Sequence, residues 1–175
     1  MSIYDNTVIG DNVIIHANTV LGGSAFYYKN RPEGYDQLIS GGNVVIENNV
    51  DIGASCTIDR GVSASTLIKE GTKIDNLVQI GHDTIIGKKC LIASQVGIAG
   101  CVIVEDEVTI WGQVGITSGV TIGSKAIISA KSGVSKSLDS NKRYFGIPAD
   151  DFRSKYKEIA AVRKIPEILE KLKEL

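Results

Sequence analysis

An aliphatic residue recurs at every sixth position along most of the chain. The series runs unbroken from Ile68 to Val134, and the same step links Ile3 to Leu21 and Ile46 to Ile58. The 3.6-residue period of a helix does not account for this step. A second position, four places after each aliphatic residue, is mostly small or β-branched. A unit this short cannot bury its own apolar side, so the hexads must stack on one another.

Three hexads per turn would give a coil of about 18 residues, with residues i and i+18 one above another at the ~4.8 Å spacing of a parallel sheet. The sequence therefore predicts an all-β solenoid in the form of a triangular prism. Two segments interrupt the period, residues 27–43 and 63–66, and both are expected to loop out. At several corners a glycine directly follows the aliphatic residue, and we expect the chain to be packed too tightly there for a Cβ atom. These glycines are Gly10, Gly22, Gly53, Gly81, Gly87 and Gly123.

The repeat ends after Val134, which predicts a β-helix over residues 1–139 and a turn with a helical extension over residues 140–175. Apolar residues recur every three or four positions from Phe152 to Leu172, as in an amphipathic helix. Asp150 or Asp151 is a candidate N-cap, and Pro166 predicts a bend or restart. The apolar stripe is expected to pack on its own protein or on a second copy.

Charge and cysteine content argue against several classes of function. The net charge is −1 without a run of Lys or Arg, so we expect no nucleic-acid partner and no binding to an anionic membrane surface. The N-terminus lacks signal-peptide features, and no stretch approaches the ~20 apolar residues of a membrane span. We therefore expect a cytoplasmic protein without an integral membrane segment. Cys56, Cys90 and Cys101 lack metal-ligand spacing and are expected to be buried free thiols.

The stretch "IDNLVQIGH", residues 74–82, is the most specific motif in the chain. Together with "TIDRG" at 57–61, "VGIAG" at 96–100 and "FGIP" at 145–148, it resembles the UDP-3-O-acylglucosamine N-acyltransferases of lipid A biosynthesis. The resemblance covers essentially the whole chain. It implies the left-handed parallel β-helix of the hexapeptide-repeat acyltransferases, whereas parallel crossovers in general are right-handed.

That family moves a (3-hydroxy)acyl chain from the phosphopantetheine thioester of acyl carrier protein to the 2-amino group of a UDP-3-O-acylglucosamine, without a metal or redox cofactor. The attacking amine must lose a proton, and a neutral imidazole suits this task, so His82 is expected to be the general base. The resemblance implies that Asp75 holds this imidazole and that the Gly100 N–H binds the oxyanion. Gly100 lies 18 residues beyond His82 and should stack on it. Asn76 and Gln79 are expected to position substrate or acyl donor.

Other polar and aromatic residues have more ordinary explanations. His16 is expected to be outward and solvated. Asp59 and Arg60 either contact substrate or, more commonly, form a structural ion pair or turn. Trp111 should point away from the core toward a subunit face, and the aromatic cluster at 26–28 is a candidate lining for an acyl or uracil site.

The resemblance also implies a homotrimer whose active sites lie in clefts between adjacent prisms. Family members carry an N-terminal uridine-binding domain before the β-helix, whereas this sequence begins at the hexads. It would then be a shortened chain or a naturally short relative. Two alternatives remain open: an acetyl-CoA-dependent nucleotide-sugar N-acetyltransferase, and a noncatalytic β-helix paralogue. Asp75, His82 and Gly100 argue against the noncatalytic alternative, and the missing uridine domain argues for it.

Overall fold

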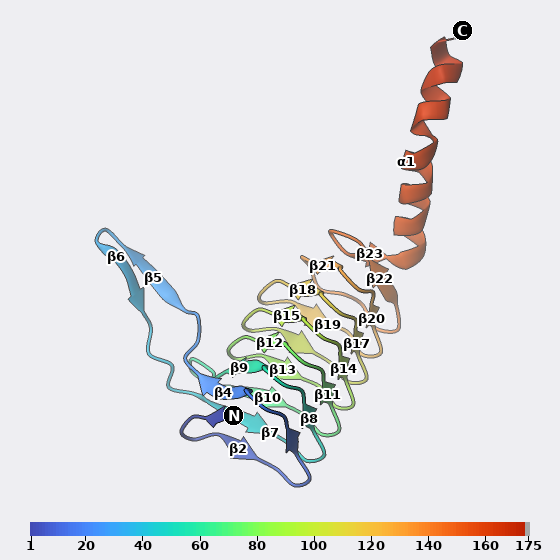
Figure 1. The fold of residues 1–175 in the computed structure, drawn as a ribbon. Coiled ribbons are helices and arrows are strands. Elements are labelled where there is room, and N and C mark those ends of the chain that lie inside the picture. The colour runs from blue at the N-terminus through green and yellow to red at the C-terminus, as the bar shows by residue number, and fades with distance from the viewer. Residues whose placement is uncertain (174–175) are drawn as a thin grey trace.

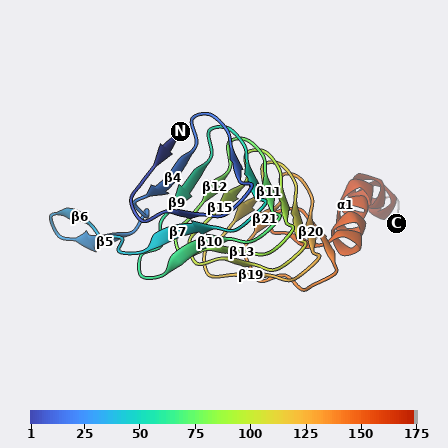
Figure 2. The same cartoon turned by 90° about the horizontal axis from the view of Figure 1, so that it is seen from below.

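A computed structural model describes residues 1–173 and shows a parallel β-solenoid of about eight turns followed by one helix (Figure 1). Seen along its axis, the solenoid is a three-sided prism (Figure 2). The predicted fold, a left-handed parallel β-helix with a C-terminal helical extension, is confirmed.

Each side of the prism is one sheet. Sheet A contains β1 (Ser2–Ile3), β4 (Val20–Gly23), β9 (Thr57–Asp59), β12 (Gln79–Ile80), β15 (Gly97–Ile98), β18 (Gly115–Ile116) and β21 (Gly133–Val134). Sheet B contains β2 (Val8–Ile9), β7 (Asn43–Ile46), β10 (Ser65–Ile68), β13 (Ile85–Ile86), β16 (Ile103–Val104) and β19 (Thr121–Ile122). Sheet C contains β3 (Ile14–Ile15), β8 (Asp51–Ile52), β11 (Lys73–Ile74), β14 (Leu91–Ile92), β17 (Thr109–Ile110), β20 (Ile127–Ile128), β22 (Arg143–Phe145) and β23 (Asp150–Asp151).

The strands of successive coils pair in the register that the hexads predict. From β10 to β18 each strand pairs in parallel with the strand one coil later, as in Ile80 with Ile98 and Ile86 with Val104. The aliphatic residues that define the period fill the interior, and Ile80 and Ile86 are fully buried. Removing this apolar surface from water on all three sides is what makes stacking favourable.

The corners of the prism have a repeating backbone conformation. The third residue after the aliphatic one is left-handed in most hexads, with φ between 54° and 64° although the residue is not glycine. An L-residue in this region costs roughly 1–2 kcal/mol, which the stacked coils must offset. The glycines directly after the aliphatic residue serve close approach, as predicted: a Cβ on Gly81 would lie 2.6 Å from the nitrogen of Gly100.

Both interruptions of the repeat leave the prism at the corner between sheets A and B. The first forms a projecting antiparallel hairpin of β5 (Tyr28–Arg31) and β6 (Gly34–Gln37), inserted between β4 and β7 (Figures 1 and 2). The second, around residues 62–64, lies between β9 and β10. The first segment loops out as predicted until β7 begins at Asn43, whereas only the first half of residues 63–66 does, because Ser65 and Thr66 belong to β10. The corner that both insertions share carries the candidate site.

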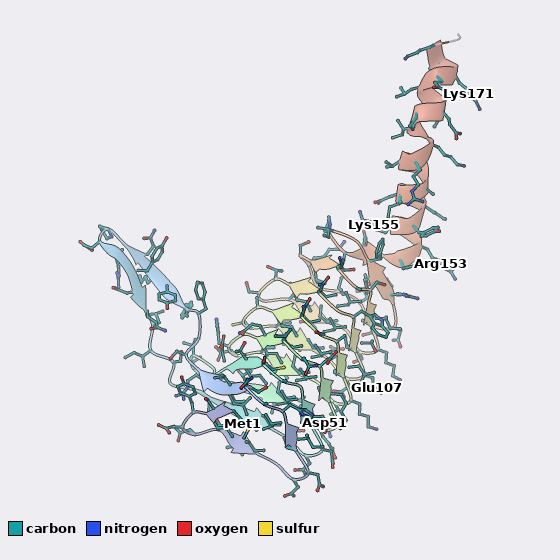
Figure 3. All side chains as sticks on the ribbon, in the orientation of Figure 1. Met1, Asp51, Glu107, Arg153, Lys155 and Lys171 are labelled. Carbon is teal, nitrogen blue, oxygen red and sulfur yellow. The ribbon has the colours of Figure 1, made fainter. Side chains whose placement is uncertain are left out.

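The terminal helix, α1 (Phe152–Lys173), extends away from the prism (Figure 1), so that Lys171 lies far from it in Figure 3. Asp151 caps its N-terminus, because Oδ1 accepts the N–H groups of Arg153 and Ser154 at 3.0 and 3.1 Å. Pro166 lies within the helix without ending it, and none of its described side chains is buried. Only the start of the apolar stripe packs on its own prism: the Phe152 ring lies 6.1 Å from that of Phe145 and 4.8 Å from the Arg143 guanidinium carbon, whereas the apolar side chains from Tyr156 onward are exposed. Residues 1–173 contain no helix apolar enough to cross a membrane.

Candidate functional site

The candidate site lies at the corner between sheets A and B, where His82 follows β12. Because both insertions leave from this corner in earlier coils, they surround His82. The hairpin brings Tyr27 over the imidazole, with 5.6 Å between the two ring centroids. His16, by contrast, is exposed on an early coil, as predicted.

The His82 imidazole is held by the next residue, Asp83. The His82 Nδ1 and Asp83 Oδ2 atoms are 2.8 Å apart, and both side chains are 16% exposed. Asp83 also accepts the backbone N–H groups of Val62, Ser63 and Ala64, at 2.9, 3.4 and 3.0 Å. The second insertion therefore forms a cradle that fixes the carboxylate while the carboxylate fixes the ring.

The charge state of Asp83 determines which ring nitrogen carries the proton. Burial works to raise the pKa of Asp83, but the hydrogen bonds from Val62, His82, Ala64 and Ser63 outweigh it and hold this pKa below its usual value. An ionised carboxylate only accepts hydrogen bonds, so the neutral imidazole carries its proton on Nδ1. Its Nε2 is then an unprotonated acceptor.

Gly100 stacks against this free nitrogen, as its spacing predicts. An ideal Cβ on Gly100 would lie 2.5 Å from His82 Nε2, so only glycine fits here without a shift. The Gly100 N–H has no acceptor among residues 1–173. At several other corners the equivalent N–H is capped by a side chain, since Ala54 N–H donates to Asn76 Oδ1 and Lys88 N–H donates to Asp106 Oδ1. One coil after Gly100 the Ser118 N–H likewise has no acceptor among residues 1–173. The corner above His82 thus keeps an unused donor.

A cavity of about 550 Å³ opens on this corner. Its lining includes Tyr27, Asp59, Gln79, His82, Gly100 and Cys101. The aromatic ring of Tyr27, the carboxylate of Asp59 (the acidic wall) and the imidazole of His82 all line this cavity, which suits a substrate with both polar and apolar parts.

The acidic wall depends on Gln79. Its Nε2 donates to Asp59 Oδ2 at 2.9 Å, and its Oε1 contacts the hydroxyl of Thr57. Burial raises the pKa of Asp59, while the Gln79 hydrogen bond and the nearby His82 oppose that rise. Asp59 thus lines the cavity, where the sequence favoured a structural ion pair or turn. Arg60 does have a structural role, since its Nε donates to the Gly22 carbonyl at 2.7 Å.

The structure does not bring Asp75 and Asn76 to this cavity. Asp75 follows β11 at the corner between sheets C and A, and its Oδ1 accepts the N–H of Asn76 at 2.7 Å. The Asn76 side chain is engaged in capping Ala54. The prediction that Asp75 holds the imidazole of its own chain is wrong, because its position in the coil places it one corner before His82. Asp83 occupies that role instead.

Asp75 instead faces a second hollow, of about 320 Å³, on sheet C. Trp111 and Leu91 also line it, and both are about half exposed. The prediction that Trp111 points away from the core is confirmed. The middle of sheet C therefore has an exposed apolar patch around Leu91 and Trp111, with Lys73 and Asp75 at its edge.

The cysteines were only partly predicted. Cys56 and Cys90 are buried free thiols, but Cys101 is exposed. Cys101 is the left-handed third residue of its hexad, whose side chain points out of the corner. The signal for both Cys101 and Asp83 was available in the sequence, because they are 18 residues apart and therefore stack beside the His82–Gly100 pair.

Comparison with known proteins shows that this chain is similar to acyltransferase sequences. Residues 65–100 match the family model for the bacterial transferase hexapeptide (six repeats). UDP-3-O-acylglucosamine N-acyltransferases of Methylobacterium nodulans, Rhizobium meliloti and Helicobacter pylori are 41%, 47% and 43% identical, over 91%, 87% and 91% of this chain. The matches cover 46%, 44% and 48% of those proteins, in their C-terminal part. The chain thus spans about half the length of the curated relatives it matches.

Solved structures agree on the fold. A UDP-N-acetylglucosamine acyltransferase superposes with a TM-score of 0.76 at 24% identity, over 95% of this chain and 64% of its own. The corresponding enzyme of Francisella novicida gives 0.71 at 24% identity, over 84% of this chain and 59% of its own. At this level of identity the likeness supports the β-helix and nothing finer.

The Asp83 cradle predicts a pH-dependent contribution to stability. Because its folded-state pKa is lowered, the carboxylate stabilises the fold above its unfolded pKa and loses this effect as the pH falls through the lowered folded-state pKa. Asp83→Asn should lower the free energy of unfolding by about 2 kcal/mol at pH 7, and by less at pH 3. Urea unfolding at both pH values measures this difference. Asp75→Asn is the control, since its carboxylate meets one neighbouring N–H; an equal loss in both variants would contradict the cradle.

Proposed function

We propose that this chain is the acyl-transferring part of a UDP-3-O-acylglucosamine N-acyltransferase of lipid A biosynthesis. It would move a 3-hydroxyacyl chain from acyl carrier protein to the 2-amino group of the sugar. The observation that carries this proposal is the arrangement at the A–B corner: an imidazole with Nε2 free, Nδ1 held by Asp83, and an uncapped Gly100 N–H against it. The named relatives, at 41–47% identity, support the substrate class.

The geometry suits amine attack on a thioester. As the sugar nitrogen bonds to the thioester carbon, Nε2 of His82 takes its proton, and Asp83 stabilises the imidazolium that forms. The negative charge on the carbonyl oxygen is met by the Gly100 N–H, a kind of donor whose loss can cost ~3 kcal/mol of barrier. The intermediate then expels the phosphopantetheine sulfur, which receives the proton from His82. Nucleophile, base and oxyanion donor are all accounted for without a metal or redox cofactor.

The remaining cavity residues position the acceptor. Asp59, held by Gln79, offers a carboxylate to the amine or a hydroxyl of the sugar. Gln79 is therefore a positioning residue that acts through Asp59. Tyr27 covers the imidazole from the other side and shields it from water.

The assembly would be a homotrimer with its sites between adjacent prisms. The exposed apolar patch on sheet C, with Trp111 and Leu91 half exposed, suits packing against a neighbouring copy. If it packs against a neighbour's A–B corner, Asp75 reaches that copy's cavity from outside. The role predicted for Asp75 would then be an intersubunit one, and Asn76 would support the same edge.

The activity is tested by acylating a UDP-3-O-acylglucosamine with a 3-hydroxyacyl carrier protein. His82→Ala should lower the rate by ~10²–10⁴-fold, the usual contribution of a general base. His16→Ala, the other histidine, should match the wild type. Equal losses in both variants would contradict the site. Faster transfer from acetyl-CoA than from the acyl carrier protein would show that acetyl-CoA, and not the carrier protein, is the acyl donor.

The intersubunit role of Asp75 is tested by complementation. Asp75→Ala and His82→Ala chains, each inactive alone, are mixed by co-expression with different tags. Three quarters of randomly mixed trimers contain both variants, and each of these has one site with both residues intact, so about a quarter of the wild-type rate should return. Mixtures that stay inactive would place Asp75 in the site of its own chain, and an Asp75→Ala homotrimer that is active alone would place Asp75 outside any site.

A further inference from the structure

Three potential metal ligands converge on the side of the imidazole that faces away from Gly100. The His82 Nδ1, Asp83 Oδ2 and Cys101 Sγ atoms all lie within 4.8 Å of one another. Nδ1 is 2.8 Å from Oδ2 and 4.0 Å from Sγ. Asp83 and Cys101 are the left-handed residues of stacked hexads, so both side chains leave the same corner side by side. The coil register itself builds this cluster.

The geometry argues against a nucleophilic role for Cys101. In a catalytic triad the nucleophile and the carboxylate contact opposite nitrogens of the imidazole. Here the thiol and the carboxylate both approach Nδ1, and Nε2 faces Gly100. Burial, and then the charge of Asp83, raise the pKa of the Cys101 thiol, so it is not activated at neutral pH. The three atoms are therefore arranged around a common centre, as metal ligands are, and do not form the nucleophile–imidazole–carboxylate series of a catalytic triad.

We propose that His82, Asp83 and Cys101 bind a thiophilic divalent cation, zinc above all, and that this cation inhibits the enzyme. Imidazole nitrogen, carboxylate oxygen and thiolate sulfur are the donors that zinc takes, with three protein ligands and an open fourth position. Tetrahedral bonding places such atoms roughly 3.3–3.6 Å apart. The pair at 2.8 Å must open and the pair at 4.0 Å must close, each by a few tenths of an ångström. The Asp83 oxygen and the Cys101 sulfur, which lie within 4.8 Å of each other, must also come to this distance. Cys101 is exposed, so an ion can enter from solvent.

Binding would block the base through the tautomer of His82. The metal takes the lone pair of Nδ1, so the ring proton that was shared with Asp83 moves to Nε2. A protonated Nε2 cannot accept a proton from the sugar amine. The Cys101 proton is released to solvent as the thiolate forms, which makes affinity rise with pH. This inhibition rests on the proposed role of His82, whereas the binding itself does not.

Binding is tested with Co²⁺ on the full chain under reducing conditions. Cobalt bound to a thiolate gives a near-ultraviolet charge-transfer band, which wild type and His16→Ala should show and which Zn²⁺ should remove by competition. Cys101→Ser should lack the band and bind Zn²⁺ at least tenfold more weakly by calorimetry. The buried thiols Cys56 and Cys90 remain in that variant as internal controls. A missing band in wild type, or a band that persists in Cys101→Ser, would overturn the site.

Inhibition is tested separately, by dividing each variant's acyl-transfer rate in Zn²⁺ by its own rate in chelator. This ratio should be about 0.1 or lower for wild type and for His16→Ala, and close to one for Cys101→Ser. A cobalt band without zinc inhibition would overturn the tautomer mechanism. Failure of the chelated wild type to transfer any acyl group would instead count against the proposed function, because the cobalt measurement needs no turnover.

Discussion

The backbone hydrogen bonds between successive coils are the constraint on which the rest of the molecule depends. From β10 to β21 they join strands whose aligned residues are 18 positions apart: Ile80 aligns with Ile98, and the Gly81 N–H donates to the Ile98 carbonyl at 2.8 Å. The corner at the site is tied in the same way, because the Cys101 N–H donates to the His82 carbonyl at 2.8 Å. Each bond contributes only about 1 kcal/mol net, but together with the buried aliphatic column they fix the register. The position of a residue in the sequence therefore determines at which corner or side of the prism its side chain lies and which side chains lie above and below it.

That register explains how a chain with two histidines assembles a site at one of them. Both insertions interrupt the repeat at the A–B corner, so Tyr27 and the cradle at 62–64 lie beside His82. The two sides of the imidazole then have different surroundings. Nδ1 faces Asp83 and Cys101, whereas Nε2 faces Gly100 and the cavity. The same ring can therefore act as a base on one side and bind a cation on the other, but not both at once.

The sequence predicted the prism, the terminal helix and the Gly100–His82 stack because each rests on a period that can be counted. It failed for Asp75 because the resemblance supplied that role without regard to the corner of the coil at which the residue lies. The period itself places Asp75 one corner too early. Asp83 was overlooked although it is adjacent to His82, since its importance depends on the cradle at residues 62–64, whose path the hexads do not determine. Cys101 is exposed because its backbone is left-handed at the corner of the prism, and a residue other than glycine gives no sign of this conformation in the sequence.

The measurement that tests this account most directly is the tautomer of His82, read from its ¹⁵N chemical shifts and N–H couplings in the wild-type protein. It is recorded without metal, at a pH well above the range in which histidine protonates. The account predicts a proton on Nδ1, bonded to Asp83, and a bare Nε2 toward the Gly100 corner. A proton found on Nε2 instead would mean that Asp83 does not set the imidazole for proton acceptance, and would contradict the central claim.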